Sequence, residues 1–254
     1  MSFWNLLGIE LKKIKRGKII PLLFVAPLLV VGSGVASLQQ YFTPEYTNAW
    51  AAMFIQSALV YAYYLLPLSM IVVCTMIDAC ERGNNGIRKM LVLPVSRYAI
   101  STAKFCVLVF FLFLELVIFL AAFVIAGGFA LRYAEITETL PVLYLLKSCG
   151  ELFLTMLPVT ACMWAITSVV KKPLFSVGVN MFLVIPGVLV ANTPLWVAYP
   201  YCYSGYLVSC SLHRFTVEET QATFDVFPFL PCAVLLFGIA YIIAIMRFGI
   251  KDIS

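Results

Sequence analysis

The chain has 254 residues, of which 63% are hydrophobic and only 11% are charged, and its formal net charge is +5. Soluble domains carry roughly a quarter charged residues, so this composition excludes an ordinary water-soluble fold and indicates an integral membrane protein. We expect no nucleic-acid partner.

The first 18 residues predict a helix that lies on the membrane surface. Phe3, Leu6, Leu7, Glu10 and Ile14 fall near one helical stripe, and a basic cluster stands opposite them. This pattern is typical of an amphipathic helix at the inner membrane interface. The polar residues assigned to this interfacial helix are Glu10, Lys12, Lys13 and Arg16. The alternative is a polybasic flank that only sets the topology.

Six apolar runs follow, and each is close to the 20 or so residues that a helix needs to cross a membrane. They cover residues 19–38, 51–77, 105–126, 152–170, 174–197 and 227–246. None shows the polar face of a surface helix or the alternation of a β-barrel strand. We therefore predict an all-α integral membrane protein with six transmembrane helices, forming a single domain over residues 1–254.

Lysine and arginine residues set the orientation. In a six-span arrangement fourteen of them fall on one side, and only Arg132, Lys147 and Arg214 fall on the other. The positive-inside rule then places both termini in the cytoplasm. We expect the chain to be a multi-pass protein of a bacterial plasma membrane. The outer side carries seven acids against three bases, which would attract a cationic ligand. The alternative interpretation is that these acids are merely solvated loop charges.

The outer connections differ in length, and 198–226 is the longest. Residues 141–151 hold Lys147 and Glu151 at a helical spacing of four, which predicts an extension of the fourth helix. The fifth span contains Pro186, Gly187 and Pro194, so it is either a kinked helix or two half-helices that turn back. Cys202 and Cys210 are placed where they can face the outside, and their pairing is open.

The sequence lacks the residues of an enzyme. His213 is the only histidine, and no phosphate-binding GxxxxGK[ST] loop is present. We therefore predict a non-enzymatic chain without a metal or cofactor of its own, so any ATP is bound elsewhere. Glu115 lies inside the third apolar run, where an ionisable group is costly. It is a candidate intramembrane polar site, either for a proton or cation or as a structural hydrogen-bonding group.

A basic segment at residues 80–104, the coupling segment, interrupts the apolar runs. Glu81, Gly83 and Gly86 would start and bend a short amphipathic helix, Leu91 belongs to its apolar face, and Pro94 ends it. Ser96 and Arg97 then begin the return to the membrane. Such a helix is suited to receiving force from a docked motor subunit.

At these positions the chain resembles the permease subunits of ABC type-2 exporters. The resemblance rests on Glu81, Gly86, Met90-Leu91, Pro94-Val95-Ser96-Arg97, Ile100 and Lys104. The opening Glu10-Leu11-Lys12-Lys13-Ile14-Lys15-Arg16 is similar to the lantibiotic-immunity and antimicrobial-peptide-resistance branch.

The resemblance implies a complex of two permeases, identical or different, and two ATPase subunits that bind ATP and Mg. Its cargo would be an amphiphilic cationic peptide moved from the lipid bilayer to the outside. An ATP-independent secondary transporter that uses Glu115, and a membrane sensor, are the alternatives.

Overall fold

The computed structural model describes residues 3–15, 19–36, 49–82, 96–133, 139–170, 172–213 and 224–248. Helices account for 93% of these residues, and the described ranges contain no strand, which confirms the all-helical class. The elements in chain order are α1 (Phe3–Lys15), α2 (Ile19–Ala36), α3 (Ala49–Val60), the π-helix η2 (Tyr61–Leu65), α4 (Leu66–Arg82), α6 (Arg97–Tyr133), α7 (Val142–Val169), α8 (Pro173–Val184), α9 (Gly187–Ala191), the 3₁₀ turns η4 (Pro194–Ala198) and η5 (Pro200–Cys202), α10 (Tyr203–His213) and α11 (Val226–Arg247).

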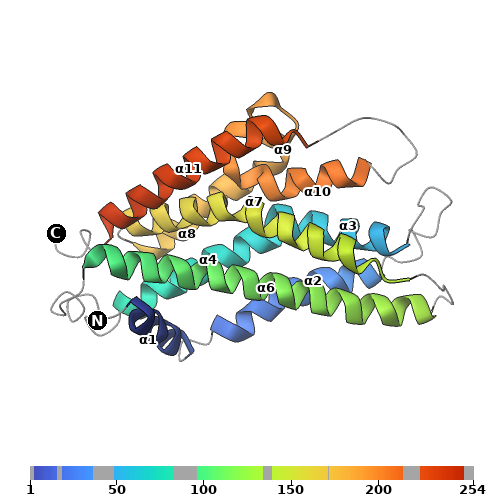
Figure 1. Cartoon of the computed structure of the whole chain (residues 1–254), viewed down its shortest axis with the longest axis horizontal. Helices are drawn as coiled ribbons and strands as arrows, with labels where there is room; N and C mark the ends of the chain where they lie inside the picture. The colour runs from blue at the N-terminus through green and yellow to red at the C-terminus, as the bar shows by residue number, and fades with distance from the viewer. Residues whose placement is uncertain are drawn as a thin grey trace.

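The long helices run side by side along one axis, and α1 lies at one end of the bundle (Figure 1). The same end holds the last turn of α11 and the start of α6. The N-terminal helix and the C-terminal helix therefore approach the same face, as the predicted topology requires. Which side of a membrane this face meets remains a prediction.

Five helices are long and apolar enough to cross a membrane. Three of them are single helices, α6 (Arg97–Tyr133), α7 (Val142–Val169) and α11 (Val226–Arg247). The other two combine consecutive elements: Met53–Cys80 runs through α3, η2 and α4, and Pro173–Ala191 runs through α8 and α9. The shorter apolar helix Ile19–Val35 coincides with the first predicted span. At 1.5 Å per residue it covers about 25 Å, somewhat less than the roughly 30 Å hydrocarbon layer. Each of the six predicted runs thus coincides with an apolar helix, and five of them reach spanning length.

The fourth span confirms the predicted helical extension, because α7 begins at Val142 and continues to Val169. Lys147 and Glu151 lie on its exposed side with their charged atoms 3.9 Å apart. The third span is longer than its apolar run, since α6 has 37 residues and begins at Arg97. Its first turns carry polar residues that enter the bundle instead of facing solvent, including Ser101 and Lys104.

The fifth candidate span, Pro173–Ala191, is interrupted by a turn between α8 and α9. α8 ends at Val184, and Pro186, which has no backbone N–H, stands in the turn before α9. The Tyr199 hydroxyl donates to the carbonyl of Leu183 beside this break. The Tyr201 hydroxyl donates to the Asn180 side chain at 2.9 Å, which ties η5 back to α8. A neighbouring side chain thus satisfies the Leu183 carbonyl at the break, as an apolar environment demands.

Part of the range predicted as the longest outer connection, 198–226, is packed into the bundle. α10 lies against α3 and α7, and its Ser204 donates to the carbonyl of Ala62 at 2.8 Å. A Cβ at Gly205 would lie 2.2 Å from the ring of Tyr63, so only glycine permits this approach to η2. Cys202 and Cys210 are both buried thiols, and they do not form a disulfide with each other in this structure.

Candidate functional site at the base of α6

The structure describes the two ends of the coupling segment. Glu81 lies in the last turn of α4, and Ser96 and Arg97 lie where α6 begins. The predicted residues Gly83, Gly86, Leu91 and Pro94 lie outside the described residues, as does Arg16 of the predicted interfacial helix. The geometry of the site therefore rests on α1 and on the first turns of α6.

Ser96 caps α6. Its side-chain oxygen accepts a hydrogen bond from the backbone N–H of Ala99 at 3.2 Å, and its carbonyl accepts from the N–H of Ile100 at 3.2 Å. A serine N-cap of this kind is typically worth about 1 kcal/mol. Arg97, the next residue, is exposed to solvent. The Ser-Arg pair thus sets where the long helix starts and presents a cation beside the coupling segment.

α1 is amphipathic, as predicted, and it packs against α6. Leu6 and Glu10 are buried, whereas Trp4, Ile9 and Lys12 are exposed. The buried face therefore includes a carboxylate, which is unusual for an apolar stripe. The exposed face carries an indole and a lysine, a composition typical of a helix at a membrane interface. The interfacial position of α1 itself remains a prediction.

The Glu10 carboxylate receives two ammonium groups. Lys104 Nζ on α6 lies 2.7 Å from one oxygen, and Lys13 Nζ lies 2.8 Å from the other. Glu10 and Lys104 are each only 1% exposed, so their pair joins α1 to α6 out of contact with water. Burial raises the pKa of the Glu10 carboxyl, but Lys104 and then Lys13 outweigh it, and the net pKa is lowered. Glu10 is therefore ionised at neutral pH.

Two further hydrogen bonds converge on the same turns of α6. The Trp164 indole of α7 donates to Ser101 Oγ at 3.3 Å, and the Tyr241 hydroxyl of α11 donates to Thr102 Oγ1 at 3.1 Å. Together with Lys104 they connect the base of α6 to α7, α11 and α1. We call Ser101, Thr102 and Lys104, with their partners Trp164, Tyr241 and Glu10, the α6 base cluster.

Sequence reasoning found only part of this cluster. It singled out Glu10 as an interfacial residue and Lys104 as the end of the coupling segment, but it did not pair them. Trp164 and Tyr241 were missed, because each is one aromatic residue in an apolar run. The one feature of the sequence that could have indicated them is a polar group, an indole N–H or a phenolic hydroxyl, near the inner end of a span. Such a group needs a hydrogen-bond partner when it is buried.

Glu115 forms a separate polar site. It is fully buried on α6, and its Oε2 accepts a hydrogen bond from Ser69 of α4 at 2.8 Å. The buried Tyr61 hydroxyl of η2 also interacts with this carboxylate. Glu115 lies eleven residues beyond Lys104, about 16 Å along the helix, so it does not belong to the α6 base cluster. Over the described part of the chain, no group of three His, Cys, Asp or Glu residues is arranged to hold a metal ion.

An all-helical bundle with apolar helices of spanning length is the architecture of a multi-pass membrane protein. A sequence model of the ABC-2 family transporter proteins matches residues 6–187, from α1 into α9. The match covers more than half of the chain, which therefore belongs to this family and is a multi-pass protein of the cell membrane. Such permeases work with ATPase partners. No curated protein and no solved structure matches the chain.

Proposed function

We propose that this chain is the permease subunit of an ATP-driven exporter that expels lantibiotic or other cationic antimicrobial peptides. Two separate ATPase subunits, which bind ATP and Mg, would dock on the coupling segment, and a second permease of the same or another sequence would complete the path. The observation that carries the proposal is the α6 base cluster, whose residues Ser101, Thr102 and Lys104 form the end of this segment within the family-matched region.

The cluster suggests how force would spread through the permease. Closure of the ATPases would push on residues 81–97, and the push would enter α6 at its capped first turn. From there the Glu10–Lys104 pair would carry it to α1, while Trp164 and Tyr241 would carry it to α7 and α11. Because hydrogen-bonded buried groups resist separation, these four helices would move together.

The cationic peptide cargo is supported by charge. On the predicted topology the outer side carries seven acids against three bases. Asp225 directly precedes α11 and Glu151 lies in the first half of α7, whereas the α6 base cluster contacts both helices in their second halves, at Tyr241 and Trp164. An acidic outer face favours the approach of cationic ligands. The similarity of residues 10–16 to the lantibiotic-immunity branch points the same way.

The first test is co-purification. The chain is expressed with its genomic neighbours, extracted in mild detergent, and its companions are identified by mass spectrometry. We expect an ATPase at a one-to-one ratio with permease chains. A stable permease with no nucleotide-binding companion would contradict the proposal.

Arg97→Ala with Arg132→Ala as its control makes the test specific to the site. Both arginines are exposed and both belong to α6, but Arg97 begins the helix and Arg132 is in its last turn. We expect Arg97→Ala to weaken ATPase association and peptide resistance, while Arg132→Ala leaves both intact. Equal behaviour of the two variants would refute docking at the coupling segment. Alanine at Gly86 or Pro94 is expected to act like Arg97→Ala.

A further inference from the structure

A groove of about 410 Å³ opens between α7, α10 and α11. Its volume falls within the roughly 300 to 1,000 Å³ typical of small-molecule sites. Its walls are almost wholly apolar, and they include Leu154, Pro158, Leu207, Phe229, Leu230 and Ala233. At one end the groove reaches the α6 base cluster, because its lining residue Phe237 stacks on Tyr241 with 5.9 Å between ring centroids.

One end of the groove is acidic. Glu151 lines it, and the side chain of Glu151 is 39% exposed. Asp225, also exposed, lies between the lining residues Phe224 and Val226. Lys147 approaches Glu151, but at 3.9 Å and with 68% of its side chain exposed it makes a weak pair that solvent screens. A ligand cation can therefore replace Lys147 at small cost.

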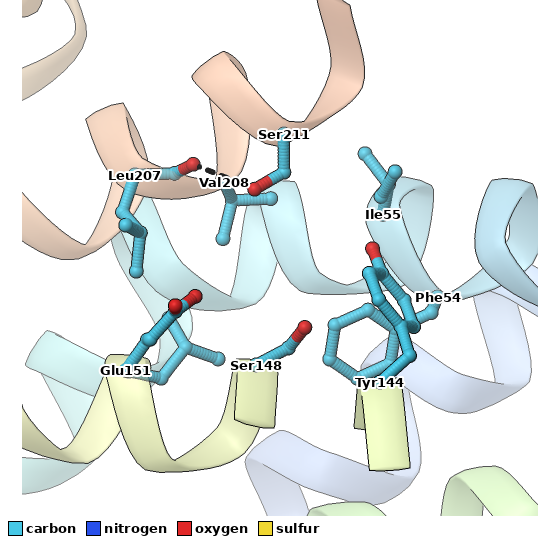
Figure 2. Close-up of a pocket in the computed structure, with 9 residues that line it drawn as sticks. Phe54, Ile55, Tyr144, Ser148, Glu151, Leu207, Val208 and Ser211 are labelled. Atoms are coloured by element: carbon cyan, nitrogen blue, oxygen red, sulfur yellow. Dashed lines mark hydrogen bonds between the residues drawn. The ribbon is translucent and has the colours of Figure 1, made fainter. Parts of the chain in front are cut away.

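A second, smaller pocket lies beside the groove and shares the lining residues Glu151 and Leu207 with it. It is lined by Glu151 itself and by Tyr144, Ser148 and Ser211 (Figure 2). Figure 2 shows the Glu151 carboxylate on α7 directed toward Leu207 of α10, and Leu207 lines both hollows. Glu151 thus lies between the apolar groove and a small pocket whose lining also includes hydroxyl groups.

The two ends of the groove can be assigned to particular residues. α7 and α11 run the same way along the bundle (Figure 1), so Glu151 and Phe224 mark one end and Pro158 and Phe237 mark the other. At the acidic end, Phe224 packs against Phe229 with 5.0 Å between ring centroids and against Trp196 with 5.5 Å. Aromatic faces attract quaternary ammonium groups. Charge and aromatic rings therefore coincide where a ligand head would lie.

We propose that this groove binds a cationic amphiphile, with its alkyl chain along α11 and its cationic head between Glu151 and the aromatic cluster of Phe224 and Phe229. Charge complementarity selects this occupant over a zwitterionic lipid, which would bring a phosphate to the same carboxylate. The role of the groove as a cargo site rests on the proposed export function, whereas binding itself does not.

The test measures binding without ATPases. The permease is reconstituted in phosphatidylcholine nanodiscs and titrated with an undecyl chain that carries a dansyl group and ends in trimethylammonium. The probe with a terminal carboxylate is the matched anion. We expect the cation to bind about fivefold more tightly than the anion, the ratio that one partly exposed charge pair provides. Glu151→Gln should abolish that ratio, and Lys147→Gln should increase it.

A second pair of variants tests the apolar part. Leu230→Trp fills the groove, whereas Leu235→Trp places the same ring at another exposed site on α11 that does not line it. We expect Leu230→Trp to weaken both probes and Leu235→Trp to leave both unchanged. Two outcomes would overturn the proposal: equal binding of cation and anion to the wild type, which would indicate an ordinary lipid position, or equal effects of the two tryptophans. Binding as expected in a chain that co-purifies with no ATPase would refute export and keep the site.

Discussion

Breaking the Glu10–Lys104 pair should release α1 from the bundle. Both residues are 1% exposed, and removal of one partner from a buried pair typically costs about 3 to 5 kcal/mol, because a charge is left without compensation. After Lys104→Met, Glu10 keeps Lys13 at 2.8 Å, so we place this variant at about 3 kcal/mol, the lower end. The loss falls on the docking of α1, because the pair is the buried ionic link between α1 and α6.

Amide hydrogen exchange measures this loss locally. At 3 kcal/mol the amides of residues 3–15 should exchange about a hundredfold faster in Lys104→Met, while those of α7 stay near wild type. Lys12→Ala is the control, because Lys12 is an exposed lysine on the same helix. The double variant Glu10→Leu with Lys104→Met should recover most of the protection, since an apolar pair avoids the uncompensated charge.

The reasoning fails if α1 in Lys104→Met exchanges at the wild-type rate, because the pair then contributes nothing to docking. It fails equally if the double variant is no better protected than Lys104→Met, because the loss then comes from packing and not from charge. In the assembled exporter, the double variant also separates stability from coupling. Restored protection without restored peptide resistance would indicate that the ionic pair itself serves coupling.

Three further outcomes follow from the structure. Because folding lowers the pKa of Glu10, its ionised carboxylate contributes to the stability of the fold fully above pH 4.5, and this contribution is lost as the pH falls through the lowered pKa. The melting temperature of the wild type should therefore fall more steeply below about pH 4.5 than that of the Glu10→Leu, Lys104→Met double variant. Ser96→Ala should cost about 1 kcal/mol in thermal or denaturant unfolding, and an unchanged stability would argue against the cap. Glu115→Gln should preserve both stability and transport if Glu115 only accepts the Ser69 hydrogen bond, because the amide oxygen can accept it too; loss of transport with normal folding would favour the gradient-driven alternative.

Much of the architecture was predictable because the bilayer imposes a simple rule on sequence. A spanning helix must be apolar over about 20 residues, so the six apolar runs locate the helices before any packing is known. The amphipathic pattern of residues 2–17 predicted α1, and Lys147 with Glu151 predicted the extension of α7. The broken fifth span was anticipated only as one of two alternatives. The docking of α10 on η2 was not anticipated, because the approach of Gly205 to Tyr63 joins segments about 140 residues apart.

By itself, then, the sequence determined the class of protein and the positions of the apolar helices, because these depend on composition and local periodicity. Only the tertiary structure decided which polar groups meet. Glu10 and Lys104 are 94 residues apart, and Ser101 and Trp164 are 63 apart, so no local pattern pairs them. The same holds for the groove at Glu151, whose walls come from three helices. The packing of the helices brings these residues together. Inside the bundle the low dielectric constant strengthens the electrostatic part of their hydrogen bonds.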